Sequence, residues 1–81
     1  MLFRSVRATL IPNPADNLIR IVVPEMEGKF NVRIFSPEGS LVLHTRLAQG
    51  SLLSVSDLAP GIYMVRIDNG EQTAFAKLMK R

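Results

Sequence analysis

Apolar and polar side chains alternate along most of this chain with a period of two, in short runs that turn residues separate. In one run, Phe30, Val32 and Ile34 fall on one face of the chain. The residues between them, Asn31 and Arg33, fall on the opposite face. This pattern predicts β-strands with one buried and one wet face. The expected strands cover residues 6–10, 18–23, 30–35, 41–45, 51–55, 63–68 and 72–79.

Proline and glycine mark the points where the chain is expected to reverse. The Ser-Pro-Glu-Gly run at 36–39 predicts a tight turn, because proline fixes its own φ and glycine accepts a positive φ. The Pro-Gly pair at 60–61 favours a type II turn. The Asn-Gly pair at 69–70 favours a type I′ turn, which joins two antiparallel strands in a hairpin.

The strands and turns together predict the architecture. About seven short strands, separated by turns at intervals of roughly 8–12 residues, indicate an all-β chain. Two sheets can cover each other's apolar faces, so we expect an Ig-like antiparallel β-sandwich. A five-stranded barrel of the oligonucleotide-binding kind is the alternative, which the number and shortness of the strands disfavour.

The composition is that of a single globular domain with a core. The 81 residues are 47% hydrophobic and 21% charged, unlike the polar composition of a disordered segment. The absence of cysteine excludes disulfide bonds and thiolate metal sites.

No apolar run approaches the roughly 20 residues of a transmembrane helix, and arginines interrupt the first residues, where a signal peptide needs an apolar stretch. If this domain is exported, another segment must start the export.

The charge of the chain is moderately basic. Ten Lys and Arg residues against seven Asp and Glu residues give a net charge of +3. Binding to nucleic acid needs several cations on one face. The internal arginines stand one per segment, however, and only Lys77, Lys80 and Arg81 gather. The sequence therefore predicts scattered cations on a solvated sheet and no nucleic-acid partner.

The residues that commonly carry chemistry form no constellation. His44 is the only histidine, and no acidic neighbour in the sequence is placed to orient it. Asp16, Asp57 and Asp68 border turns, where we expect each carboxylate to accept hydrogen bonds from local backbone amides. The five glycines each mark a turn and build no phosphate cradle. We therefore expect no catalysis, no cofactor and no metal.

The residues at turns and strand ends carry more information than the reactive ones. An aliphatic residue precedes Pro-Asn-Pro-Ala at 12–15, and a turn at Gly39 separates two strands. A Leu-x-x-Gly-x-Tyr-x-Val-x-Ile pattern follows at 58–67, and a basic, aliphatic strand at 77–81 ends the chain. In this order and spacing, residues 10–81 resemble the type IX secretion C-terminal sorting domain, the tail of cargo proteins in Bacteroidota. The matched sorting-motif residues are Pro12, Asn13, Pro14, Ala15, Gly39, Leu58, Gly61, Tyr63, Val65, Ile67, Lys77, Leu78, Lys80 and Arg81.

The resemblance implies a non-enzymatic secretion signal. In the family, the cargo enters the periplasm with a separate N-terminal signal peptide and folds there. Shuttle proteins and the outer-membrane translocon of the type IX system then export it to the outer membrane, the cell surface or the medium. A sortase-like cysteine protease cleaves upstream of the tail and often joins the cargo to anionic lipopolysaccharide.

The resemblance also divides this chain into two parts. Residues 1–9 would be a linker or first edge strand, a remnant of the junction to the upstream cargo domain. Residues 10–81 would be the sorting domain. The proteolytic cut would fall before Pro12, at or upstream of residues 1–8.

Several matched residues have structural roles that follow from their chemistry. Pro12 and Pro14 would hold an extended lead-in that cannot become helical. Gly61 would permit a tight reversal. Tyr63 would bury its ring while its hydroxyl finds a backbone partner.

Two other functions remain open on the sequence alone. The first is a carbohydrate-binding or adhesion module of an extracellular protein, although a chain with no tryptophan and one tyrosine supplies few stacking residues. The second is a small structural protein whose basic end contacts an anionic partner. We also expect homodimers, either through exposed strand edges or through exchange of the terminal strand.

Overall fold

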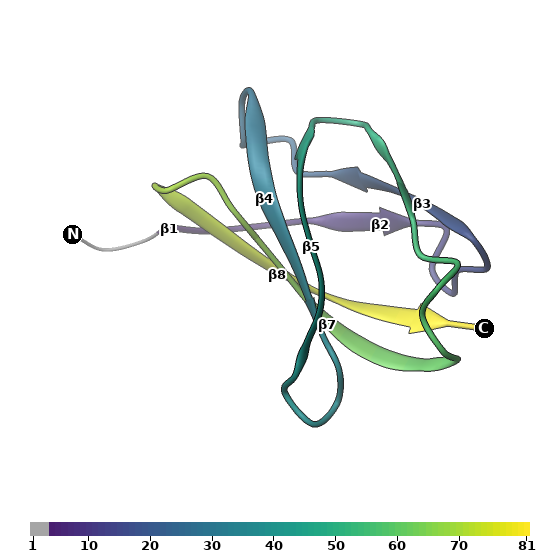
Figure 1. The fold of residues 1–81 in the computed structure, drawn as a ribbon. Coiled ribbons are helices and arrows are strands. Elements are labelled where there is room, and N and C mark those ends of the chain that lie inside the picture. The colour runs from purple at the N-terminus through teal and green to yellow at the C-terminus, as the bar shows by residue number, and fades with distance from the viewer. Residues whose placement is uncertain (1–3) are drawn as a thin grey trace.

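The computed structural model describes residues 4–81. In this part of the chain it contains eight strands and no helix (Figure 1). The strands are β1 (Arg4–Val6), β2 (Thr9–Ile11), β3 (Leu18–Val22), β4 (Lys29–Phe35), β5 (Leu41–Ala48), β6 (Leu52–Ser54), β7 (Gly61–Asp68) and β8 (Gln72–Lys80). The first three residues, which begin the expected junction to a cargo, lie outside the described residues. Among residues 4–81, no helix is long and apolar enough to span a bilayer.

The eight strands form two sheets (Figure 1). The larger sheet has the strand order β1-β8-β7-β4-β5, and the smaller sheet has the order β2-β3-β6. Neighbouring strands are antiparallel, except that β1 lies parallel to β8. The buried side chains of the two sheets form one cluster. The prediction of an all-β sandwich is therefore confirmed.

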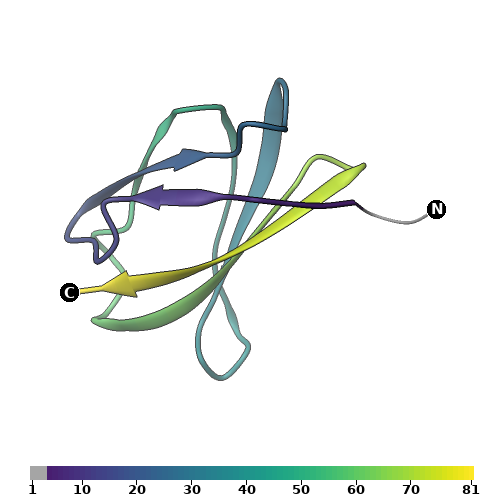
Figure 2. The same ribbon diagram turned by 180° about the vertical axis from the view of Figure 1, so that it is seen from behind.

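The first expected strand, residues 6–10, is wrong as a single element. The chain forms two strands there, β1 in the larger sheet and β2 in the smaller (Figure 2). β1 pairs with residues 72–74 of β8, whereas β2 pairs with β3 and places Leu10 opposite Ile21. One continuous ladder cannot join both layers of a sandwich, so the pairing is interrupted at residues 7–8.

Alternate residues of the strands meet between the two sheets. In β4, Phe30, Val32 and Ile34 are at most 1% exposed, and in β7 Val65 and Ile67 are fully buried. The smaller sheet completes the core with Leu10, Ile19, Ile21 and Leu53. Burial of one such side chain contributes about 1.5–3 kcal/mol, so this cluster is the main source of stability. The predicted core faces of β4 and β7 are confirmed.

Two reversals test the turns predicted at proline. The Ser-Pro-Glu-Gly turn forms as expected: the Gly39 N–H donates to the Ser36 carbonyl oxygen at 2.9 Å, and Gly39 has a φ of +92°. The type II turn expected before β7 is wrong. Gly61 is already the first residue of β7, and its φ of +157° differs from the roughly +80° of that turn. The chain reverses earlier, where the Leu58 N–H donates to the Val55 carbonyl oxygen at 3.0 Å.

The hairpin between β7 and β8 forms, but its turn type is not the predicted one. A type I′ turn needs a positive φ at both central residues, and of the Asn-Gly pair only Gly70 has one, at +94°. The Asn69 side chain accounts for the difference. Its Oδ1 accepts hydrogen bonds from the backbone N–H groups of Glu71 at 3.0 Å and Gln72 at 2.8 Å. These bonds close the reversal without a positive φ at Asn69.

Tyr63 closes the core at the other end of β7. Its side chain belongs to the buried cluster with 8% exposure, and its hydroxyl donates to the Ala59 carbonyl oxygen at 2.5 Å. The prediction of a buried ring with a backbone partner is confirmed. This bond fastens the connection between β6 and β7 to the core, as a tyrosine does at the corner of other Ig-like sandwiches.

Replacing Tyr63 with phenylalanine should keep the fold and lower the free energy of unfolding by about 1 kcal/mol. The ring still fills its site, but the Ala59 carbonyl loses its donor. Urea unfolding followed by circular dichroism measures the change. Tyr63→Ala, which also removes the ring, should cost about 3–5 kcal/mol. A phenylalanine variant as stable as the natural chain would contradict the role given to the hydroxyl.

Candidate functional site

The two ends of the predicted sorting motif lie side by side. Residues 12–15, which connect β2 to β3, run along the outer edge of the C-terminal half of β8 (Figure 2). Asn13 Nδ2 donates to the Lys77 carbonyl oxygen at 2.7 Å, and Asn13 Oδ1 accepts from the Met79 N–H at 2.9 Å. The Asn13 side chain thus pairs with a strand edge as a backbone peptide group does.

Ala15 continues this pairing toward the end of the chain. Its N–H donates to the Met79 carbonyl oxygen at 2.7 Å, and its carbonyl oxygen accepts from the Arg81 N–H at 2.8 Å. The Ala15 side chain is fully buried. We refer to residues 12–15 together with residues 77–81 as the clasp. The clasp joins two segments that are 64 residues apart in the sequence, counted from Asn13 to Lys77.

The two prolines explain why an asparagine side chain makes these bonds. Pro12 and Pro14 have no backbone N–H to donate to a strand edge. In this stretch the side-chain amide of Asn13 is the donor to β8. Both preceding peptide bonds, at Ile11 and at Asn13, are cis. The expected extended lead-in is wrong, because residues 12–14 form bends. They must bend because β2 reverses there into its antiparallel partner β3.

Two acidic residues beside turns form ion pairs in place of the expected bonds to local amides. Asp68 Oδ2 lies 2.8 Å from Arg33 Nη1 and 3.9 Å from Arg66 Nε. Asp16 Oδ1 lies 3.6 Å from Arg81 Nε, and because both side chains are mostly exposed, this pair contributes little to stability. The expectation of local amide bonds is therefore wrong for both residues. Strand register and the clasp supply partners that the sequence did not reveal.

The remaining residues of the predicted motif make none of the bonds between the two halves of the clasp. Five belong to the core or pack against it: Leu58, Tyr63, Val65, Ile67 and Leu78. Gly39 lies in a turn, and Gly61 begins a strand. Lys80 is half-buried, and its Nζ donates to the Arg81 carbonyl oxygen at 3.0 Å. The structure thus brings the two ends of the motif together and leaves the rest in the core and turns.

A second feature lies on the side of the larger sheet that faces away from the smaller sheet. We refer to the outward positions of β4, β5, β7 and β8 as the outer face. On this face Arg33 of β4 lies opposite Arg66 of β7, and Lys77 of β8 lies opposite Met64 of β7. Arg46 occupies an outward position of the neighbouring strand β5. Cations from four strands therefore share this face, and Arg33 and Arg66 are direct neighbours.

The cations that stand one per segment in the sequence share one solvated face of the larger sheet. Among the described residues, the outer face holds one anion, Asp68, and five cations: Lys29, Arg33, Arg46, Arg66 and Lys77. Each cation stands at a polar position of an alternating run, so each is isolated in the sequence but not in the sheet. A known strand register would have revealed this grouping, and the sequence alone does not provide it.

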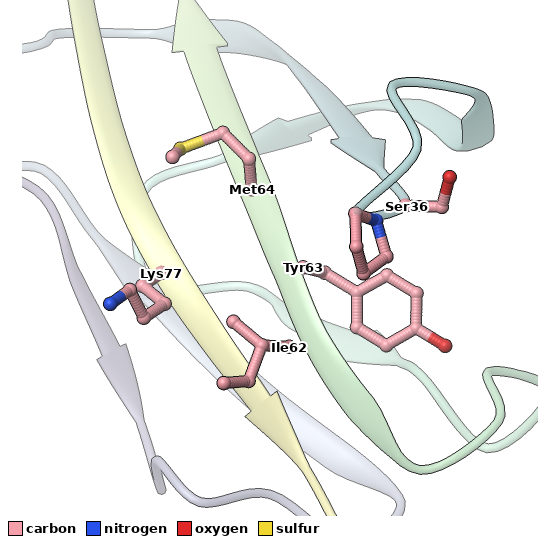
Figure 3. A pocket seen from close by; sticks show the side chains of 6 residues that line it. Ser36, Ile62, Tyr63, Met64 and Lys77 are labelled. Carbon is pink, nitrogen blue, oxygen red and sulfur yellow. The ribbon is translucent and has the colours of Figure 1, made fainter.

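A hollow of about 240 Å³ lies at one end of the outer face (Figure 3). The residues that line it are Ser36, Pro37, Ile62, Tyr63, Met64 and Lys77. Its walls are mainly apolar, and the amino group of Lys77 lies on the same side of the sheet as Ile62 and Met64 (Figure 3). The hollow can therefore receive an apolar group close to a positive charge.

Acidic and histidine side chains do not assemble into a metal site in the described part of the chain. No group of three or more His, Asp or Glu side chains in residues 4–81 could hold a metal ion. His44 is exposed on β5. Asp57 is exposed as well and makes no bond to a local amide, contrary to expectation. The clasp and the outer face are therefore the features on which a function can be based.

Replacing Asn13 with alanine should loosen the end of β8 without unfolding the domain. The variant loses two hydrogen bonds in an exposed site, where water replaces part of their strength, so we expect a loss of about 1 kcal/mol in unfolding free energy. Hydrogen exchange at the Met79 N–H, measured by NMR, should become faster. Asn17→Ala is the control, since the exposed Asn17 side chain makes no hydrogen bond within residues 4–81. Unchanged exchange at Met79 would contradict the role of Asn13.

Comparison with protein families gives a match over most of the chain. A family model described as the secretion system C-terminal sorting domain matches residues 9–81. The match begins with β2 and includes both halves of the clasp. A search of curated proteins finds no match to this chain. Because the family model covers nearly the whole chain, the chain belongs to the family of C-terminal sorting domains, the signals for type IX secretion.

Proposed function

We propose that this sorting domain is recognised as a folded surface. As a type IX signal it acts on a cargo in the same precursor and directs export across the outer membrane to the cell surface or the medium. A signal of this kind can be a linear tail or a folded shape. The clasp favours the folded shape, because backbone hydrogen bonds tie the last residues to residues 12–15.

In this proposal, cargo and domain cross the periplasm together, and shuttle proteins and the outer-membrane translocon dock the domain. Residues 10–81 are the docking unit, and residues 1–9 are the junction to the cargo. The strand order supports a boundary near residue 9, since β2 begins the smaller sheet at Thr9. The family match begins at the same residue.

A sortase-like cysteine protease then removes the domain by a cut before Pro12, at or upstream of residues 1–8. Residues 7–8 belong to neither β1 nor β2, and Arg7 is exposed, which supports access to this segment. A cut there detaches β1 from the domain, while the residues of the clasp and the fully buried core residues remain in it. The cargo is then released or joined to anionic lipopolysaccharide.

We propose no catalytic role, cofactor or nucleic-acid partner for this domain. Phe75 is the one strongly exposed aromatic side chain that the structure describes, so no observation favours the carbohydrate-binding alternative.

β5 and β6 are edge strands through which two copies can pair. Exchange of β8 between copies is opposed by the clasp, which must open first.

Residues 1–81, fused behind a periplasmic reporter with its own signal peptide, should carry the reporter out of a host that has the type IX system. Deleting residues 77–81 should keep the reporter in the periplasm, because the deletion removes one half of the clasp. Immunoblots of the periplasm, cell surface and medium measure the distribution. A reporter that stays inside the cell with the intact domain would refute the function.

A second pair of variants separates a folded signal from a linear one. Ala15→Asp leaves residues 77–81 unchanged but places a carboxylate at a fully buried position, where it should unfold the clasp. We expect export to fall to background. Asp16→Asn changes the exposed neighbour and should export as the natural domain does. Normal export of an Ala15→Asp domain that circular dichroism shows to be unfolded would favour a linear signal.

A further inference from the structure

The net positive charge of this protein is concentrated on the outer face. With five cations and one anion, the outer face carries a net charge of +4, whereas the whole chain carries +3. All other residues together therefore carry −1. Arg46 and Lys77 on this face are exposed. A one-sided field of this kind draws an anionic surface to one side of the molecule and orients it there.

Apolar side chains lie among these cations. Ile62, Met64, Phe75 and Met79 on the outward positions of β7 and β8 are 50%, 46%, 58% and 44% exposed. The register places Met79 directly opposite Ile62. Ile62 and Met64 also line the hollow, which has the size to take one apolar side chain beside Lys77 (Figure 3). Adjoining apolar side chains that stay exposed on a folded domain commonly mark a binding surface.

We propose that the outer face docks an acidic protein surface that carries an apolar anchor residue. Carboxylates of the partner pair with Arg46, Arg66 and Lys77, while the anchor enters the hollow next to Met64. A buried anchor surrounded by charge pairs is the usual arrangement of a specific protein interface. The inference rests on the proposed function in one respect, namely that the partner is a component of the export machinery.

The two ends of the outer face favour a protein over a membrane. Glu38 lies in the turn between β4 and β5, Glu71 lies in the turn between β7 and β8, and both are exposed. These turns stand at opposite ends of the strands. A bilayer extends past both ends and would bring its anionic headgroups against both glutamates. A protein surface can be acidic in its centre alone.

The apolar content of the outer face argues against nucleic acid. Phosphates would satisfy the cations but would leave Ile62, Met64 and Met79 without an apolar partner. A protein surface supplies both kinds of contact.

Photo-crosslinking in secreting cells tests the docking face. A benzoylphenylalanine at Met64 of the cargo fusion places the probe on the outer face. The same probe at Leu52, which is 53% exposed on β6 of the other sheet, is the matched control. We expect at least about five times more protein adduct at Met64 than at Leu52, since contacts concentrate at the anchor. Mass spectrometry of the adduct should identify a partner with an acidic patch.

Two charge reversals make the test specific. Lys77→Glu on the outer face and Arg20→Glu on β3 change the net charge equally but lie on different sheets, and both residues are exposed. Lys77→Glu should lower the Met64 adduct about tenfold, and Arg20→Glu should leave it within about twofold. Melting curves of the 81-residue chain show whether both variants keep the fold.

Equal adducts at Met64 and Leu52, or equal effects of the two reversals, would overturn the proposal. So would binding of the chain to phosphatidylglycerol vesicles or to a single-stranded DNA oligonucleotide in place of a protein adduct, since either assigns the face to another partner. The export assay gives an independent outcome. A reporter exported normally with no adduct at Met64 refutes the docking face alone. An adduct at Met64 on a reporter that stays in the periplasm refutes the proposed function alone.

Discussion

The outer edge of β8 is the constraint on which the rest of this structure depends. A strand edge presents N–H and C=O groups that need partners and that otherwise invite pairing with other chains. Here β1 pairs with the start of β8, and Asn13 and Ala15 bond to its end. The first and last described segments are therefore parts of one hydrogen-bonded arrangement.

This arrangement makes the clasp depend on folding. Residues 12–15 leave β2 of the smaller sheet and bond to β8 of the larger, so they reach their partners only when both sheets have formed. Before that point the prolines and the basic end are separate stretches of chain. A receptor that contacts the clasp therefore distinguishes a folded domain from an unfolded one, without any pocket or reactive group.

What the sequence could predict was the part that depends on local alternation. Phe30 and Val65 are buried because each occupies the apolar position of a two-residue repeat. The errors arose mostly where a distant partner decides the outcome. Residues 6–10 split because two different sheets pair with them, and Asp68 turned to Arg33 across the sheet. For the site, the sequence predicted the motif residues, but it could not show that Asn13 bonds to the edge of β8.

The alternation that builds the core also builds the outer face. Every strand that buries its apolar positions must turn the positions between them outward, so cations that are single in the sequence meet in adjoining strands. Asp68 compensates part of this charge at Arg33, while Arg46 and Lys77 remain open to a partner. The clasp thus holds the two ends of the motif together in the folded domain. The outer face makes one side of the folded domain basic. A small sandwich can in this way present one basic face that a partner can distinguish from the rest of its surface.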